Sequence, residues 1–320
     1  MVGGAVRASP PPLLREQTTL DNGFKPWNNM DAWKADNIET TCFWKKVNYK
    51  GNRYQHCVRP YNDLVSDQIK VNGVWSDCLR LIDLWIGLKA FGSSNFIDAG
   101  ANVGACTMLM GATFPNINIT SFEPNPATLF YLTSSLLANP DINKRVTLYP
   151  YGLGSRPAVF PLYVQSGNYG NSMLRTGIDG AAKTAHTIHV FPLDSAFITD
   201  TRTIRLMKMD VQGFENLVLA GAYHILSQQR VGCVSFEVAP NWLKSQNTTF
   251  GELYDSFSSY GYQVLTGNWQ VYSRAAAVTY KGLSDFIACS PEARRLLLKS
   301  TPGRSSHPPV ALGSRAMTEI

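Results

Sequence analysis

The 320-residue sequence predicts an α/β fold with a doubly wound, mostly parallel sheet. Short apolar runs rich in β-branched and aromatic residues alternate with longer helical patterns, which is typical of βαβ units. The hydrophobic fraction of 44% is sufficient for a sizeable core, and the charged fraction of 16% is below the usual share of about 25%. The length allows two units of about 150 residues, or one large α/β domain with decorated ends.

The expected elements alternate along residues 94–290. Strands are predicted at residues 95–98, 117–122, 146–149, 204–209 and 231–236, where the apolar runs are short. Helices are predicted between them, at residues 103–112, 127–137, 214–226 and 250–260. A sixth strand at residues 262–265 is followed by candidate hairpin partners near 271–272 and 284–288, which predicts a hairpin-like antiparallel edge.

The segments around this alternation have a different character. Residues 1–41 carry a proline run and no sustained periodicity, which predicts a flexible N-terminal extension. Residues 42–93 are expected to form an N-terminal cap segment, and residues 291–320 a short helix with a disordered tail. Within the predicted domain, residues 151–194 lack a helical pattern. Extended pieces at 159–164 and 187–191 flank an expected loop at 166–172, and this insertion is expected to lie over the site.

Charge and hydropathy exclude some partners. The formal net charge is +6, but the basic residues are scattered and form no stripe, so nucleic acid is not an expected partner. No apolar leader is present near residue 1, and no run is long and uncharged enough to span a membrane. We therefore expect no membrane segment in this chain. The compartment stays open: the cytoplasm is the default, and a secretory lumen is the alternative if an anchor is missing from this chain.

The six cysteines show no pair at the short spacing of zinc ribbons or redox motifs. Cys106 and Cys233 fall in apolar segments and are expected to be small core residues. Cys42, Cys57 and Cys78 share one region, where a disulfide could form in an oxidising compartment.

A glycine-containing turn follows the first predicted strand of the domain. The sequence Phe96-Ile-Asp98-Ala-Gly100-Ala-Asn102-Val-Gly104 leads from a strand into a helix, where open α/β sheets bind ligands. A dinucleotide site prefers three glycines spaced G-x-G-x-x-G, whereas this turn has only G-x-x-x-G. Asp98 would repel phosphates and attract an ammonium group or its water shell. A nucleoside that carries a cation is therefore favoured over a nicotinamide dinucleotide.

Glu123 follows the second predicted strand, near the offset of about 20 residues at which an acidic residue binds a ribose diol. A ribose on Glu123 and a charged amino-acid tail at Gly100 describe S-adenosylmethionine. In the alternative interpretation, Asp98 and Glu123 only cap a turn and a helix.

Further motifs follow in order along residues 63–288. They are Asp98-Ala-Gly-Ala-Asn-Val-Gly104, Phe122-Glu-Pro-Asn125, Asn139, Leu193-Asp194, Lys208-Met-Asp-Val-Gln-Gly-Phe-Glu215, Gly221-Ala222 and Phe236-Glu237. In these motifs and their spacing the chain resembles the FkbM-type methyltransferases, which implies a Rossmann-like class I methyltransferase fold. The resemblance implies that S-adenosylmethionine is bound by Asp98, Gly100, Asn102, Gly104, Glu123 and Asn125, with Leu153 and Gly154 beside the adenine and Asp210 at the same crevice. Gln212 departs from the family, in which Glu is common at this position.

Methyl transfer needs an acceptor atom held in line with the methyl group, and a group that takes or orients the acceptor's proton. Asp210, at the end of the fourth strand, is the expected base; alternatively it caps the next helix. Glu237 ends the fifth strand and is a second candidate. With Asp210 it could hold a divalent cation, although no metal is expected.

Other residues have weaker functional interpretations. His189 and His186 lie in the insertion and are alternative bases, although surface positions are more usual for such residues. Lys208 and Glu215 are expected in a salt bridge or on a solvated face. Trp75 and Trp242 are candidates for stacking on an acceptor, whereas Trp85 and Trp269 are expected in the core.

The resemblance implies O-methylation of a hydroxyl on a carbohydrate or a similar small-molecule or glycan acceptor. Two alternatives stay open. One is an N- or carboxyl-methyltransferase with the same cofactor loop, and the other is a non-catalytic Rossmann-like protein that binds the cofactor.

Overall fold

The computed structural model describes residues 24–34, 41–61, 63–89, 91, 94–165, 168–173 and 182–300. Its centre is a seven-stranded sheet in the order β12-β13-β11-β10-β3-β4-β5. The strands are β3 (Asn95–Ala99), β4 (Asn118–Phe122), β5 (Val146–Tyr149), β10 (Ile204–Met209), β11 (Val231–Val238), β12 (Gln263–Leu265) and β13 (Ser284–Cys289). Strands β11, β10, β3, β4 and β5 are parallel, whereas β13 is antiparallel to β11 and to β12. The predicted doubly wound sheet with an antiparallel edge is confirmed.

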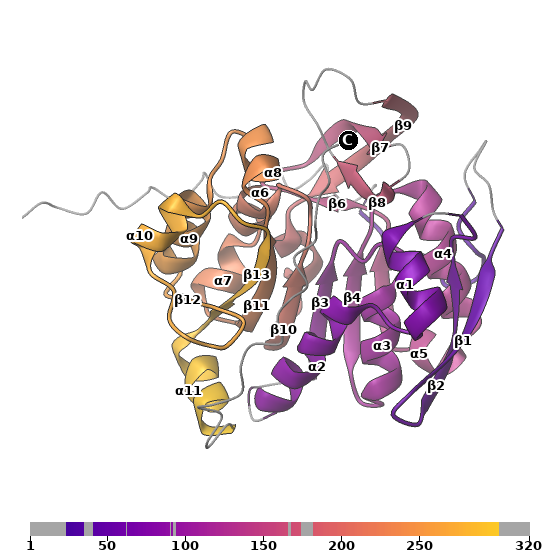
Figure 1. Cartoon of the computed structure of the whole chain (residues 1–320), viewed down its shortest axis with the longest axis horizontal. Helices are drawn as coiled ribbons and strands as arrows, with labels where there is room; N and C mark the ends of the chain where they lie inside the picture. Colours follow the sequence, from indigo (N-terminus) through magenta and orange to yellow (C-terminus); the bar gives the residue numbers. More distant parts are fainter. Residues whose placement is uncertain are drawn as a thin grey trace, which may run out of the picture.

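Helices cover both faces of this sheet (Figure 1). One face carries α1 (Leu64–Asn72), α2 (Ser76–Gly87), α3 (Ala105–Thr113), α4 (Pro126–Leu137), α5 (Pro140–Asn143) and α11 (Pro291–Ser300). The other carries α6 (Glu215–Gly221), α7 (Tyr223–Ser227), α8 (Pro240–Ser245), α9 (Phe250–Ser259), α10 (Arg274–Thr279) and a 3₁₀ helix at Leu193–Phe197. Successive residues of a strand point to opposite faces, so Phe96 joins the first apolar cluster and Ile97 the second. No helix in the described ranges has the length and apolar character that crossing a membrane requires.

The helix expected at residues 214–226 is two helices, α6 and α7, separated at Ala222. Asp194 explains why a new helix, α7, starts here: its carboxylate accepts hydrogen bonds from the backbone N–H groups of His224 (2.8 Å) and Ile225 (3.1 Å). A side chain distant in sequence therefore caps α7, which local periodicity could not show.

The insertion forms a second sheet of four strands in the order β6-β9-β7-β8. Its strands are β6 (Gly152–Leu153), β7 (Ala158–Gln165), β8 (Asn168–Met173) and β9 (Ala182–Phe191). The expectation of a loop at residues 166–172 is wrong for residues 168–172, because β8 pairs antiparallel with β7. Backbone pairing along an open strand overrides the weak strand propensity of this Gly- and Asn-containing segment. Figure 1 shows the second sheet beyond the ends of β3 and β4.

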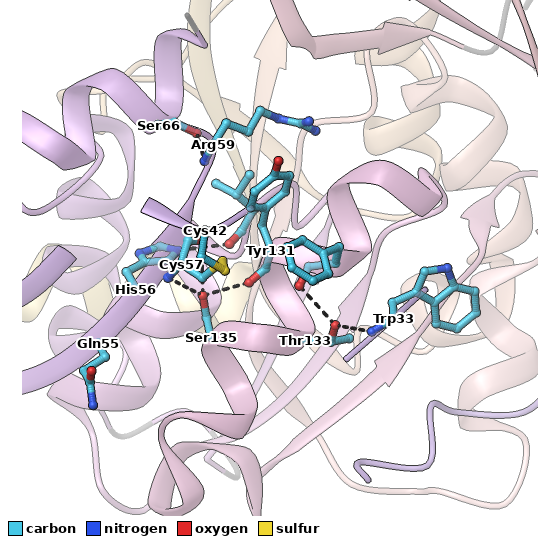
Figure 2. Close-up of a disulfide and its surroundings, with 12 residues drawn as sticks. Trp33, Cys42, Gln55, His56, Cys57, Arg59, Ser66, Tyr131, Thr133 and Ser135 are labelled. Carbon is cyan, nitrogen blue, oxygen red and sulfur yellow. Dashed lines mark hydrogen bonds between the residues drawn. A yellow bond between two sulfur atoms is a disulfide. The ribbon is translucent and has the colours of Figure 1, made fainter. Parts of the chain in front are cut away.

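The N-terminal cap segment begins with an antiparallel hairpin of β1 (Phe43–Tyr49) and β2 (Asn52–Val58). Strand β2 lies against α4, because the Cys57 N–H donates to Ser135 Oγ (2.9 Å; Figure 2). Asn139, just after α4, bonds both backbone groups of Gln55 (3.0 and 2.7 Å). The cap segment is thus joined to the domain through specific polar contacts.

Part of the N-terminal extension also packs on the domain. The Trp27 side chain is buried and its backbone N–H donates to Leu148 O (2.7 Å) in β5. Phe24 stacks on Tyr149 with ring centroids 4.7 Å apart. Two aromatic side chains from residues 24–34 therefore cover the β5 edge of the sheet. The rest of the predicted extension and tail, residues 1–23, 35–40 and 301–320, lies outside the described residues.

All six cysteines are paired, as Cys42–Cys57, Cys78–Cys106 and Cys233–Cys289. Cys106 and Cys233 are buried, but the expectation that they are simple core residues is wrong, because each forms a disulfide. Cys78 lies in α2 and Cys106 in α3, whereas Cys233 and Cys289 are direct neighbours across β11 and β13. These pairs depend on tertiary neighbours, which spacing along the chain does not reveal.

Candidate active site

The turn after β3 is built around left-handed backbone conformations. Gly100 has φ 80°, Asn102 has φ 52° and Gly104 has φ 87°. A Cβ at Gly100 would lie 1.9 Å from the backbone oxygen of Asp210, and a Cβ at Gly104 would lie 2.5 Å from Leu132 Cδ1. Glycine at position 100 therefore lets the turn approach the end of β10, and glycine at 104 lets α3 approach α4.

Glu123, directly after β4, is buried with both carboxylate oxygens held by the backbone. Oε2 accepts from the Asn102 N–H (2.8 Å) and Oε1 accepts from the Asn125 N–H (2.8 Å). Burial raises the pKa of this carboxyl to about 7, although these two hydrogen bonds and the positive charges of Lys208 and Arg59 lower it. Each oxygen keeps a second lone pair. Glu123 is thus preorganised to accept two further hydrogen bonds from a ligand.

Asp98 is fully buried at the end of β3 and lines neither of the two pockets of this site. Thr107 Oγ1 donates to its Oδ2 (2.7 Å), and Lys208 Nζ lies 3.4 Å from its Oδ1. The predicted direct contact between Asp98 and a cofactor therefore stays a prediction. The described contacts place Asp98 against the lysine and α3.

Lys208 in β10 connects three parts of the site. Its Nζ donates to Gly100 O (2.6 Å) and lies 3.5 Å from Asp210 Oδ2 and 3.4 Å from Asp98 Oδ1. Burial lowers the pKa of Lys208, but the charges of Asp98, Asp210 and Glu123 raise it above its usual value. Lys208 therefore stays a cation, and the predicted salt bridge is present.

Asp210 is the most exposed acid of this group, with 36% of its side chain accessible. Gln212 Nε2 donates to Asp210 Oδ1 (2.8 Å), so the residue that departs from the family pattern orients this carboxylate. The turn that follows uses positive φ at Gln212 (55°) and Gly213 (99°). Glu215 stabilises the turn by accepting from the Gly213 N–H (3.2 Å), and it is buried, so its expected place on a solvated face is wrong.

Two pockets share Asp210 as a lining residue. The first, at the ends of β3 and β4, combines polar groups with an apolar wall. It is lined by Gly100, Asn102, Phe122, Glu123, Pro124, Asn125, Thr128, Tyr151, Gly152, Leu153, Leu162, Asp210, Val211, Gln212 and Phe214. The second is smaller and more polar. It is lined by Trp75, Asp77, Arg80, Leu81, Cys106, Lys208, Met209, Asp210, Ser235, Phe236, Glu237 and Asp285. Asp210 is common to both.

The structure brings most of the predicted residues to these pockets. Gly100, Asn102, Glu123, Asn125, Leu153 and Asp210 line the first pocket, and Glu237 lines the second. Gly104 and Gly154 line neither: Gly104 begins α3, and the Gly154 N–H donates to Phe191 O (3.0 Å). His189 is exposed on β9 and lines neither pocket. Side chains alternate along a strand, and its neighbours Ile188 and Val190 are the buried ones. Trp75 lines the second pocket, whereas Trp242 lines neither.

Several pocket residues gave no sequence signal. Leu162 reaches the first pocket from the insertion, and Thr128 from the first turn of α4. Arg80 and Asp285 form a 2.7 Å ion pair in the second pocket although 205 positions separate them. Only the folded chain brings such residues together. Among the described residues, no group of three or more His, Cys, Asp or Glu side chains is suited to hold a metal ion.

A family model described as the Methyltransferase FkbM domain matches residues 98–264, which is 167 of the 320 residues. The chain belongs to the FkbM methyltransferase family. The match spans the glycine turn, Glu123 and Asp210, whereas the β1–β2 hairpin, α1 and α2 lie outside it. The class I methyltransferase fold that the resemblance implied is therefore confirmed.

This FkbM-family chain is similar to proteins of the same broad kind. Methyltransferase 1 of Beauveria bassiana is 29% identical over 161 residues, which cover 44% of this chain and 63% of that protein. The chain thus spans less than two thirds of that relative. Among solved structures, the methyltransferase FkbM from Methylobacillus flagellatus has 20% identity and a TM-score of 0.40, covering 62% of this chain and 43% of that one. A precorrin-6y C5,15-methyltransferase from Geobacter metallireducens has 13% identity and a TM-score of 0.36, covering 66% and 87%.

Proposed function

We propose that this protein transfers a methyl group from S-adenosylmethionine to a hydroxyl oxygen of a carbohydrate or a similar polyol. The observation that carries the proposal is the place of Asp210, which lines both pockets. A transferase needs a cofactor and an acceptor on two sides of one reacting point. Family membership supports the cofactor, and the acceptor class follows from the resemblance.

The residues of the first pocket suit S-adenosylmethionine. The carboxylate of Glu123 can accept hydrogen bonds from the two ribose hydroxyls, and Gly100 lines the same pocket. Phe122, Leu153, Leu162 and Phe214 supply an apolar wall suited to an adenine ring. When bound, the cofactor supplies an electrophilic methyl group on a positively charged sulfonium. The negative charge of Asp210 at the pocket boundary suits that charge.

The second pocket would hold the acceptor. Trp75 offers an aromatic surface, and Glu237 and Asp285 offer carboxylate oxygens that accept hydrogen bonds from hydroxyls. This combination of a ring and carboxylates is suited to an uncharged polyol. Glu237 therefore belongs to acceptor binding in this proposal and not to proton transfer.

Asp210 then has one chemical task. Gln212 Nε2 bonds one of its oxygens, Lys208 Nζ lies 3.5 Å from the other, and the remaining lone pairs accept the hydroxyl hydrogen of the acceptor. As the acceptor oxygen gains the methyl group, its proton passes to Asp210 or through it to water. Because a cation and an amide stabilise the carboxylate, orienting the hydroxyl is the larger part of this task.

The test is Asp210→Asn, which keeps the shape of the side chain and removes its charge. We expect S-adenosylmethionine affinity within a few fold of wild type and turnover lowered by about 10² to 10⁴. Calorimetry measures the affinity, and mass spectrometry of a pool of sugars and glycans incubated with protein and cofactor identifies the product. Asp255→Asn, an exposed ion-paired aspartate in α9, is the matched control. Normal turnover in Asp210→Asn removes the assigned role.

A chelator separates two versions of the proposal. Activity that survives the chelator leaves Asp210 acting directly on the acceptor. Activity that is lost with chelator and restored by magnesium makes Asp210 and Glu237 metal ligands instead.

A further inference from the structure

Arg59 follows strand β2 and is the largest of the fully buried side chains. It lies outside the residues that match the family model. Its Nη2 donates to Thr128 Oγ1 (2.7 Å), and its Cζ lies 4.8 Å from the centroid of the Tyr131 ring. Figure 2 shows the Arg59 side chain extending past Tyr131. A guanidinium from the cap segment is thus anchored on α4, the helix that begins just after Glu123.

A buried guanidinium is costly unless other groups stabilise its charge. Asp63 contributes a carboxylate, with Oδ1 3.9 Å from Arg59 Nε. Asp63 is itself engaged, since its Oδ2 accepts from Ser66 N (3.0 Å) and Ser66 Oγ (2.6 Å). The ion pair between Arg59 and Asp63 is therefore long, and the field of the guanidinium still reaches other carboxylates nearby.

Thr128 connects Arg59 to the cofactor pocket. Thr128 lines the first pocket, as do Glu123 and Asn125. Asn125 caps α4 by accepting from the Ala127 N–H (3.0 Å), and its own N–H donates to Glu123. The first turn of α4 thus carries both the group that bonds Arg59 and the group that bonds Glu123.

The charges that act on Glu123 come from two elements. Lys208 approaches from β10 and Arg59 from the end of β2, and both favour the ionised form against the effect of burial. Lys208 is shared with Asp98, Asp210 and the Gly100 carbonyl. Arg59 is the second cation that acts on Glu123, and its hydrogen bond to Thr128 fixes it beside the first turn of α4.

We propose that Arg59 is a positioning residue of the cofactor pocket: it fixes Thr128 in the first turn of α4 and places a buried positive charge beside the segment that holds Glu123, which favours the carboxylate form that receives ribose hydroxyls. This inference rests on the proposed function, because it takes S-adenosylmethionine as the ligand. It also makes the cap segment, outside the family match, a working part of the cofactor site. The carboxylate is the better acceptor for two hydroxyl protons, because a protonated carboxyl has lost part of its acceptor capacity.

The experiment is calorimetric titration of the full chain with S-adenosylmethionine between pH 5.5 and 8.5. We expect wild-type affinity to fall as Glu123 gains a proton on acidification. In Arg59→Gln the midpoint of this fall should rise by about one pH unit, and affinity at pH 7 should drop about fivefold. Arg59→Lys keeps the charge, so its midpoint should stay within about 0.3 pH unit of wild type. In a Glu123→Gln background this carboxyl no longer titrates, so Arg59→Gln should not change how the affinity depends on pH.

Asp63→Asn gives an independent result of opposite sign, and serves if Arg59→Gln does not fold. Removal of the counter-charge strengthens the effect of Arg59, so the midpoint should move to lower pH. A merely structural role for Arg59 predicts the same midpoint in Arg59→Gln and Arg59→Lys. Identical midpoints in Asp63→Asn and wild type, or in Arg59→Gln and wild type, overturn the role of Arg59. A wild-type chain that binds no S-adenosylmethionine at any pH overturns the proposed function itself, which is a distinguishable result.

Discussion

At the scale of single residues, the site depends on where a side chain is absent as much as on where one is present. Gly100 has a positive φ and no room for a Cβ, whereas Gly51 in the β1–β2 turn has a positive φ (86°) and nothing within 4 Å of the place that a Cβ would occupy. The two glycines therefore separate the effect of backbone strain from that of steric exclusion.

Gly100→Ala should destabilise the protein by more than about 2 kcal/mol, because the backbone strain of about 1 kcal/mol adds to a clash with the Asp210 carbonyl. Gly51→Ala should lose only about 1 kcal/mol, from strain alone. Urea unfolding measures both variants, and S-adenosylmethionine titration should show weaker binding in Gly100→Ala only. Equal losses in the two variants would show that the close approach to β10 has no energetic weight.

At the scale of elements, β2 supports the turn after β3 from outside the residues that match the family model. His56 is buried, and its Nε2 donates to Val103 O (2.9 Å) within the turn that joins Asn102 to Gly104. The same strand bonds α4 through Cys57, and Arg59, the next residue after the strand, bonds Thr128 at the start of α4. Strand β2 therefore contacts both segments that carry the backbone donors to Glu123, namely the turn after β3 and the start of α4.

His56 makes the stability of this arrangement depend on pH. Burial lowers the pKa of His56 from 6.5 to about 4, although the hydrogen bond to Val103 raises it. Below pH 6.5 the unfolded chain binds a proton that the folded chain rejects. Stability is therefore full above pH 6.5 and is lost as the pH falls toward 4, by about 2 kcal/mol at pH 5.

The measurement compares wild type with His56→Gln, which keeps a donor and does not titrate. Urea unfolding at pH 7.5 and pH 5 should show that the variant loses about 2 kcal/mol less on acidification. Glu123 and Glu215 act with the opposite sign, because burial raises the pKa of each to about 7. The contribution of His56 is therefore the difference between the two proteins in the stability lost from pH 7.5 to pH 5. Equal losses of stability would contradict a buried, neutral His56.

At the scale of the whole molecule, three disulfides connect separate parts of the fold. Cys78–Cys106 joins α2 to α3, Cys233–Cys289 joins β11 to β13, and Cys42–Cys57 joins the start of the cap segment to the end of β2. Such bonds form and persist in oxidising compartments. We therefore expect folding in such a compartment, which favours the secretory alternative over the cytoplasmic default.

Reduction should lower the melting temperature by at least about 10 °C, because each bond contributes about 2 to 4 kcal/mol. Differential scanning calorimetry with and without dithiothreitol measures the change. The non-reduced chain should take up no alkylating reagent even after denaturation, whereas the reduced chain should take up six equivalents, one for each cysteine. Alkylation of the non-reduced chain, with an unchanged melting temperature on reduction, would contradict the pairing.

The sequence by itself determined the central sheet, since alternation of short apolar runs and amphipathic helices depends on the period of each element and not on distant contacts. It also placed Gly100, Glu123 and Asp210 at one edge, because parallel strands end on the same side of a sheet. Only the tertiary structure decided the three disulfides, the cap on α7 from Asp194, the neutral His56 and the buried Arg59. The disulfides join cysteines that are at least 15 positions apart in the sequence. The states of His56 and Arg59 depend on burial from water, although Arg59 also has a near neighbour in sequence, Asp63. A local pattern carries no information about such neighbours, because the free energy of a charge, a thiol or an imidazole is set by its surroundings in the folded chain.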